Sequence, residues 1–375
     1  MRRQLPVFPL NTVVFPGVPV TLSVDPGDDA RVLRIGGEAA FGTVADVAPG
    51  LSADTVYVLD GMSASVSAFA ADGRHLFAFG GRGGGPGEFR GLESLHLLPG
   101  DTVAAYDYMA GRLSFFAPGG AFVRGVTVEP VDGKLPPRPL GFFGDGRMLV
   151  TPLYNPNFVN SPKPTRDTVT LAVYSAAGTQ TTSLGRVPGQ ESVTITGGEG
   201  ANRVAMRDVP PFALATSFSV TGTRLLVADP ARYELVERRP DGSVVRLIRR
   251  DIEREPVTQG DRDGYIERRR QDRNDPRFRQ MEERLMKSLT FPEHKPFFTA
   301  VAMDPAGNAW VRRNDDPDAE TPWDVFDAEG RLLGTVTTPA GLRVTQIGAD
   351  FIVGTWSDEL EVPHVRVYRL EKPAA

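Results

Sequence analysis

The stretch from Trp323 to Gly334, WDVFDAEGRLLG, contains an apolar strand that ends in an aromatic residue, a short turn at Gly330 and a second apolar strand. This order is typical of a hairpin between neighbouring antiparallel strands, because glycine accepts the positive φ that tight hairpin turns require. A recurring unit of this kind indicates a repeat architecture. The same order recurs with turns at Gly73, Gly120, Gly178 and Gly242.

A further short apolar strand precedes each hairpin, and six such strands can be identified. The aromatic position recurs from Phe69 to Phe116, an interval of roughly 40–50 residues that matches one four-stranded blade. The sequence therefore predicts an all-β fold, a six-bladed β-propeller, with an inner strand before each of the six. In the fourth blade we expect this inner strand at residues 212–215. The six strands that directly precede the hairpins, and follow the inner strands, are Thr55–Asp60, Thr102–Asp107, Arg147–Thr151, Arg224–Asp229, Asn308–Arg313 and Asp350–Thr355.

The composition agrees with a repetitive β fold and excludes several classes of function. The 40 Gly and 32 Pro, with 24% charged residues, favour short strands and tight turns over long helices. A net charge of -5 provides no basic surface to collect phosphates, so we expect no nucleic-acid partner. The absence of Cys excludes disulfides, thiolate metal sites and a cysteine nucleophile. No apolar run is long enough to predict a membrane span.

The two ends of the chain are predicted to meet. The sixth hairpin begins at residues 365–370 but has no partner strand after it, whereas residues 30–37 resemble an outer strand and have no hairpin mate. Pairing the two would satisfy an open sheet edge and close the ring. We therefore expect residues 30–375 to form the propeller and residues 1–29 to form an N-terminal leader of unclear role.

Residues 251–297 interrupt the β pattern with a charged, helical insertion between blades 4 and 5. Thr258 and Asp261 form an approximate capping box for a helix that ends near Asp272. A second helix is predicted to begin at Asp275 and Pro276. Two interpretations remain open: a solvated flap across one propeller face, or a lid that docks a partner. The apolar face of the second helix would comprise Phe278, Met281, Leu285 and Leu289.

The ends of the six second strands place polar side chains at equivalent positions around the ring. Asp60, Asp107 and Asp229 recur there, and converging carboxylates are ligands that Ca²⁺ prefers; no other cofactor is expected. In the alternative interpretation, each aspartate accepts backbone N–H bonds and caps its own turn. With their ring neighbours, the candidate ligand-binding residues are Asp60, Asp107, Tyr108, Asp229, Arg313, Asn314 and Trp356.

Two motifs resemble those of a known family. Residues 84–89, GGPGEF, are similar to the GxGPGEF signature of NHL-repeat propellers, and Val227-Ala228-Asp229 resembles their YVAD strand. The stretch 323–334 is similar to bacterial six-bladed propeller proteins of unassigned function. The resemblance implies the propeller fold and an extracytoplasmic location, although the N-terminus contains no clear signal peptide.

The sequence favours a binding module over an enzyme. The resemblance points to propellers that include lactonases and metal-dependent lyases, but His75, His96, His294 and His364 lie on different elements and form no ligand triad. No GxSxG nucleophile elbow is present either. Our leading hypothesis is a monomeric, non-catalytic propeller that presents a loop face to a protein or a carbohydrate-like partner. The alternative is a Ca²⁺-dependent hydrolase or lactonase centred on Asp60, Asp107 and Asp229.

Overall fold

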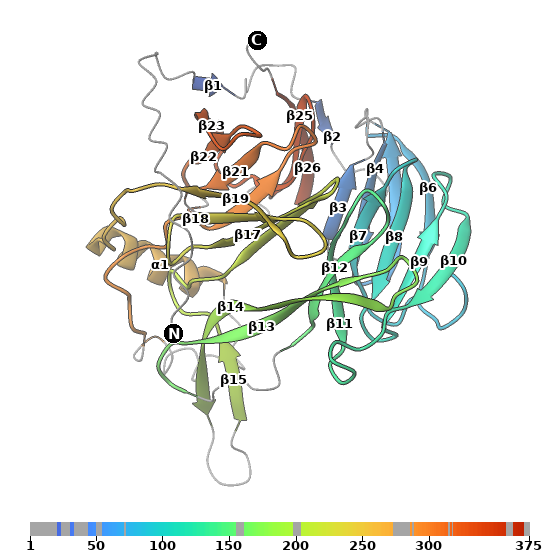
Figure 1. Ribbon diagram of the computed structural model, residues 1–375, viewed down its shortest axis with the longest axis horizontal. Helices are drawn as coiled ribbons and strands as arrows, with labels where there is room; N and C mark the ends of the chain where they lie inside the picture. Colours follow the sequence, from blue (N-terminus) through green and yellow to red (C-terminus); the bar gives the residue numbers. More distant parts are fainter. Residues whose placement is uncertain are drawn as a thin grey trace.

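The computed structural model shows six β-sheets arranged as the blades of a propeller (Figure 1). In Figure 1 the sheets follow one another in chain order around the ring, from the blue first blade to the red sixth blade. The six-bladed, all-β fold predicted from the sequence is therefore confirmed. The structure describes residues 21–23, 31–33, 44–49, 55–70, 73–154, 161–197, 204–272, 286, 289–313, 316, 318–357 and 363–370.

The first three blades each run from an inner strand at the axis to an outer strand at the rim. Blade 1 contains β3 (Val44–Pro49), β4 (Thr55–Asp60), β5 (Ser65–Ala70) and β6 (His75–Gly80). Blade 2 contains β7 (Leu92–Leu98), β8 (Thr102–Asp107), β9 (Arg112–Phe116) and β10 (Phe122–Thr127). Blade 3 contains β11 (Pro137–Phe142), β12 (Met148–Pro152), β13 (Thr165–Tyr174), β14 (Gln180–Gly197) and β15 (Val204–Asp208).

The other three blades repeat this order, and two of them include a strand from the N-terminal part of the chain. Blade 4 contains β16 (Ser217–Thr221), β17 (Arg224–Asp229), β18 (Glu234–Arg238) and β19 (Val244–Arg249). Blade 5 contains β20 (Ala300–Met303), β21 (Ala309–Arg312), β22 (Thr321–Phe326), β23 (Leu332–Thr338) and β1 (Thr21–Ser23). Blade 6 contains β24 (Arg343–Ile347), β25 (Phe351–Ser357), β26 (Pro363–Arg369) and β2 (Arg31–Leu33).

The inner strands form a closed ring around the axis. Each contacts the inner strands of its two neighbours, in the order β3, β7, β11, β16, β20, β24 and back to β3. The first strand of every blade begins, and the second strand ends, at the same face of the ring. We call this the loop face, because the connections between successive blades also lie there.

Apolar side chains hold neighbouring blades together. The second strands lie inside the sheets, so every side chain of β4 and β8 after the first is buried, whereas the outer strand β10 is almost wholly exposed. One hydrophobic cluster fills each of the six spaces between blades. Val58 and Phe69 of blade 1 pack in one cluster with Val353 and Val365 of blade 6. Side chains therefore join the first blade to the last.

The N-terminal segment pairs with the last two blades. Strand β2 is antiparallel to β26, with Val32 opposite Arg366. The paired residues fall within the two segments that were expected to meet, and the contribution of this pairing to closure of the ring stays a prediction. Strand β1 is parallel to β23, with Leu22 opposite Val336, and no feature of the sequence predicted this second pairing.

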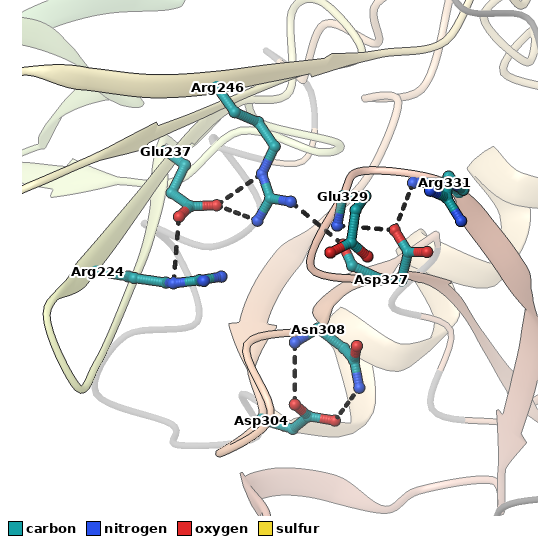
Figure 2. Close-up of polar contacts among 8 residues, drawn as sticks. All are labelled: Arg224, Glu237, Arg246, Asp304, Asn308, Asp327, Glu329 and Arg331. Carbon is teal, nitrogen blue, oxygen red and sulfur yellow. Dashed lines mark hydrogen bonds and ion pairs between the residues drawn. The ribbon is translucent and has the colours of Figure 1, made fainter. Parts of the chain in front are cut away.

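Charged side chains add links on the face opposite the loop face (Figure 2). Glu237 of β18 is 1% exposed and forms ion pairs with Arg246 of β19 and, at 3.5 Å, with Arg224 of β17. Arg246 also donates from Nη1 to the main-chain oxygen of Asp327 in blade 5, at 3.4 Å. The carboxylate of Asp327 caps its own hairpin turn by accepting from the main-chain N–H of Glu329 and of Arg331. Buried charge thus connects blades 4 and 5.

The structure corrects one expectation about strands. The inner strand of blade 4 is Ser217–Thr221 rather than residues 212–215, because Phe212 has a φ of +54° and cannot belong to an extended strand. In blade 3, the strands β13, β14 and β15 also continue past the loop-face end of β12. In Figure 1 the β14–β15 hairpin projects from the ring at the bottom of the view.

The insertion begins with the predicted helix. Helix α1 (Gln259–Asp272) starts at the expected capping box, in which the hydroxyl and main-chain N–H of Thr258 donate to the carboxylate of Asp261 and the N–H of Asp261 donates back. Most of the second predicted helix, including Asp275, Pro276 and Leu285, lies outside the described residues, as do Asn314 and most of residues 1–29. None of the described helices is long and apolar enough to cross a membrane.

Candidate functional site

A cavity of about 380 Å³ follows the propeller axis. Five of the six inner strands contribute to its described lining, and Arg312, the last residue of β21, marks its extension towards the loop face. The edge of each inner strand that faces the axis has no strand partner. The described lining comprises Leu95, His96, Leu97, Leu140, Gly141, Phe142, Phe218, Ser219, Val220, Ala300, Val301, Ala302, Arg312, Trp323, Val344, Thr345, Gln346 and Ile347.

The cavity combines aromatic rings with neutral polar groups. Phe142, Phe218 and Trp323 supply the rings, and uncharged donors and acceptors come from residues such as Ser219 and Gln346. Among the described lining residues there is no carboxylate, and Arg312 is the only side chain that is always charged. Pockets built in this way hold a small ligand by shape and fix its orientation with a few hydrogen bonds.

His96 is the titratable group of this cavity. Its imidazole Nε2 lies 3.2 Å from the Ser94 hydroxyl, and its ring centroid is 5.2 Å from that of Phe142. Burial lowers the pKa of His96 to about 4, because the charged imidazolium loses its hydration there. The side chain is therefore a neutral hydrogen-bonding group at neutral pH.

The predicted aspartates lie at the ends of their strands on the loop face, and each caps its own turn. Asp107 is fully buried, and its Oδ1 accepts from the main-chain N–H of Met109 and Ala110, both at 3.1 Å. The same carboxylate accepts from Arg90 N at 2.8 Å and Gly91 N at 3.0 Å, which joins the turn to the connection from blade 1. The capping interpretation is confirmed for this residue.

Asp60 and Asp229 also cap the turns that follow their strands, with different partners. Asp60 accepts from the main-chain N–H of Met62 and from the Ser63 hydroxyl. Asp229 accepts from Ala231 N and forms an ion pair with Arg166 of β13, at 2.7 Å. Within the part of the chain that the structure describes, no three His, Asp or Glu side chains lie close enough to hold a metal ion. The calcium hypothesis therefore gains no support from the geometry and stays a prediction for metal titration to test.

The remaining sequence candidates have separate positions. Tyr108 is 43% exposed on the turn after Asp107. Arg313 donates from Nε and Nη2 to the buried carboxylate of Asp324, and these hydrogen bonds raise the pKa of the guanidinium. Trp356 of β25 lies under the guanidinium of Arg366, at 3.6 Å from the ring centroid. The structure brings none of these side chains into the axial cavity.

Extensions of blades 3 and 5 are joined by α1 on the loop face. Arg269 of α1 forms a buried ion pair with Asp208 of β15. Arg268 lies 3.2 Å from the carboxylate of Asp318, in the connection between β21 and β22. Tyr265 of α1 packs within one aromatic group with Phe212 and Phe291. Arg268 and Arg269 of the helix therefore contact two blades that are not neighbours.

Sequence reasoning missed the residues that line the axis. His96 was assigned to an inner strand, and this position alone could have indicated a channel-lining side chain. Arg312 was overlooked in favour of Arg313, because the end of the strand was predicted one residue too late. The ion pairs of Arg166 and Arg269 join residues far apart in the chain and leave no local signal in one sequence.

Comparisons with known proteins support the fold. The sequence matches no protein-family model and no curated protein. Solved structures do match. A member of the DUF4221 family from Bacteroides vulgatus is similar over 90% of this chain and 95% of that chain, with a TM-score of 0.51 and 10% identity.

Two further similar structures carry functional names. A calcium-binding regucalcin from Agrobacterium tumefaciens has a TM-score of 0.42 and 10% identity, over 92% of this chain and 95% of that chain. A gluconolactonase from Xanthomonas campestris has a TM-score of 0.43 and 10% identity, over 88% of both chains. At this identity the similarity concerns the propeller fold, not the ligand, and the likeness to NHL repeats remains one of motifs.

Proposed function

We propose that this propeller is a non-catalytic binding module whose axial cavity takes a small carbohydrate-like ligand. The observation that carries the proposal is the lining of the cavity: aromatic rings and neutral hydrogen-bonding groups, with no carboxylate among its described residues. A sugar ring has apolar C–H faces that pack on aromatic rings, and hydroxyl groups around its edge that both donate and accept hydrogen bonds.

The protonation state of His96 favours such a ligand. A neutral imidazole has one donor and one acceptor nitrogen, which matches a hydroxyl group better than a charged imidazolium does. A neutral polyol satisfies such a mixed set without bringing a charge into a half-enclosed site.

The loop face supports binding because its projecting parts are attached to one another. Arg269 and Asp208 fix α1 to the blade 3 extension, and Arg268 connects it to blade 5. A preorganised rim loses little conformational entropy when a ligand binds.

The test is isothermal titration with a fixed panel of glucose, galactose, mannose, N-acetylglucosamine, maltose and cellobiose. We expect at least one saccharide to bind, and Gln346→Leu to weaken that binding about tenfold, because it removes hydrogen bonds worth about 1.4 kcal/mol from a side chain in the cavity lining. Gln180→Leu, the same substitution on β14 outside the cavity, should leave the affinity unchanged. No binding by any member of the panel, or equal weakening by both variants, would refute the proposal.

A further inference from the structure

His96 is held from two sides at the wall of the axial cavity. Its Nε2 lies 3.2 Å from the Ser94 hydroxyl, and its ring packs against Phe142 of the neighbouring blade, with 5.2 Å between the ring centroids. Ser94 and His96 are two residues apart on β7, so their side chains lie on the same side of the strand. The hydrogen bond therefore needs no other chain segment, and the imidazole has a defined orientation.

The second ring nitrogen of His96, Nδ1, is the one that a ligand can reach. Among the described residues, Ser94 is the only hydrogen-bond partner of the imidazole. Nδ1 is not one of the buried polar atoms that lack a partner, so the protein does not enclose it. Since the accessible part of His96 belongs to the cavity lining, Nδ1 faces the cavity.

The position of the imidazole proton follows from counting donors and acceptors. A serine hydroxyl can donate or accept, and a neutral imidazole has one N–H and one acceptor nitrogen. If Nε2–H donated to Ser94, the hydroxyl proton would have no acceptor, because this hydroxyl forms no other hydrogen bond with the described residues. If Ser94 donates to Nε2, the hydroxyl proton is bonded and the imidazole proton is on Nδ1, where a cavity ligand can accept. The second arrangement leaves fewer polar groups unpaired and is therefore favoured.

We propose that Ser94 keeps the imidazole proton of His96 on Nδ1, so that the cavity presents an N–H donor to an acceptor oxygen of its ligand. The proposal rests on the proposed cavity function and deepens it, because it specifies the chemistry of the ligand at one position. A ring, glycosidic, hydroxyl or carbonyl oxygen accepts from Nδ1–H, whereas an ammonium group or an amide N–H does not. Ser94 is not among the described lining residues, so it is a positioning residue that acts on the ligand through His96.

Nuclear magnetic resonance tests the proton position without any ligand. Long-range ¹H–¹⁵N correlation spectra distinguish protonated from unprotonated ring nitrogens, and the four histidines of the chain allow assignment by His96→Gln. Because burial lowers the pKa of His96 to about 4, the ring is neutral at neutral pH. We expect Nδ1 to be protonated in the wild type, and Ser94→Ala to populate the form with the proton on Nε2. Ser94→Thr keeps a hydroxyl and should retain the wild-type pattern.

Isothermal titration with the tightest-binding saccharide of the panel tests the contact with the ligand. Ser94→Ala should weaken binding about fivefold, because the donor at Nδ1 is then present in only part of the molecules. Ser94→Thr should bind as the wild type does. The matched control Ser67→Ala changes a serine of β5 that is not among the described lining residues, and it should leave both the spectra and the affinity unchanged.

Other outcomes would overturn the proposal. A proton on Nε2 in the wild type, or the same spectra for wild type and Ser94→Ala, would show that Ser94 does not set the proton position. A changed proton position with unchanged affinity would show that the ligand does not accept from Nδ1. Failure of every saccharide of the panel to bind would refute the cavity function, and the spectra would then decide the role of Ser94 separately.

Discussion

Asp107 illustrates how a buried carboxylate serves the fold. Its two oxygens accept four main-chain N–H bonds, from Arg90, Gly91, Met109 and Ala110. These donors belong to two chain segments, so one side chain fixes both the turn of blade 2 and the connection that enters it. Hydrogen bonds to a charged acceptor contribute more than neutral ones, which explains why a charged side chain can be buried here.

Replacing this acceptor should therefore cost stability. We expect Asp107→Ala to lower the free energy of unfolding by about 2–4 kcal/mol, because four buried N–H groups lose their partner. Asp107→Asn should cost less, since the amide oxygen can keep the three bonds to Oδ1 and only the bond from Arg90 N is lost. Urea denaturation measures both variants.

The same residue tests the calcium hypothesis. With its oxygens occupied by N–H donors, Asp107 is not oriented to bind a cation, so adding millimolar CaCl₂ should leave the melting temperature of the wild type unchanged relative to EDTA. A ligand that binds the folded state would raise it. A calcium-dependent rise that Asp107→Ala removes would instead support the hydrolase alternative.

His96 should make stability depend on pH. Its pKa is about 4 in the folded chain and 6.5 in an exposed histidine, so the unfolded chain binds more protons between these values. The stabilisation is complete above pH 6.5 and is lost as the pH falls towards 4, by on the order of 1–3 kcal/mol. The lowered pKa values of Asp145 and Asp261 act below 3.8, outside this window. Urea melts of wild type and His96→Gln across the window measure the effect, and an equal slope in both would contradict this assignment.

At the scale of the element, the inner strands differ from the others in what they must satisfy. The outward edge of such a strand pairs with the second strand, but the edge at the axis has no strand partner. Side chains of blade 4 satisfy two of these main-chain groups in blade 5. The Ser217 and Ser219 hydroxyls accept from the main-chain N–H of Val301 and Met303 in β20, at 3.0 and 2.9 Å. In β16, hydroxyl side chains therefore serve the neighbouring strand in addition to the apolar packing.

This requirement explains which strands the sequence predicted well. Second strands and hairpins are apolar and end at glycine turns, and Gly330, for example, has the expected positive φ of 85°. The inner strand of blade 4 was misplaced to residues 212–215, because that segment is more apolar than Ser217–Thr221. Apolar character alone does not identify a strand whose edge is satisfied by serine side chains.

Contacts between distant elements could not be predicted from local sequence patterns. The capping box of α1 was predicted because Thr258 and Asp261 are three residues apart. The attachment of the same helix to Asp208 joins residues 61 positions apart, and nothing near Arg269 distinguishes it from the neighbouring arginines. The turn-capping role of Asp107 was available as an alternative from sequence, whereas the axial cavity required the assembled ring.

At the scale of the whole molecule, two sets of contacts lie where the first and last parts of the chain meet. Side chains of blades 1 and 6 form one hydrophobic cluster, and β2 continues the sheet of blade 6 at its outer edge. The cluster closes the interior, whereas β2 covers an edge that would otherwise be open to pairing with other chains. We expect the two sets of contacts to contribute separately, so removing the N-terminal segment should destabilise the propeller without abolishing its fold.

Stepwise truncation tests this division. Removal of residues 1–29 deletes β1 and keeps β2, whereas removal of residues 1–37 deletes both. We expect the longer truncation to lower the melting temperature by about 5–10 °C more than the shorter one, because the edge of β26 loses its partner and the two chain ends are no longer tied. The longer truncation should also aggregate faster on heating, since the main-chain groups along the edge of β26 become open to pairing with other chains. Equal melting temperatures for the two truncations would show that the hydrophobic cluster between blades 1 and 6 closes the ring alone.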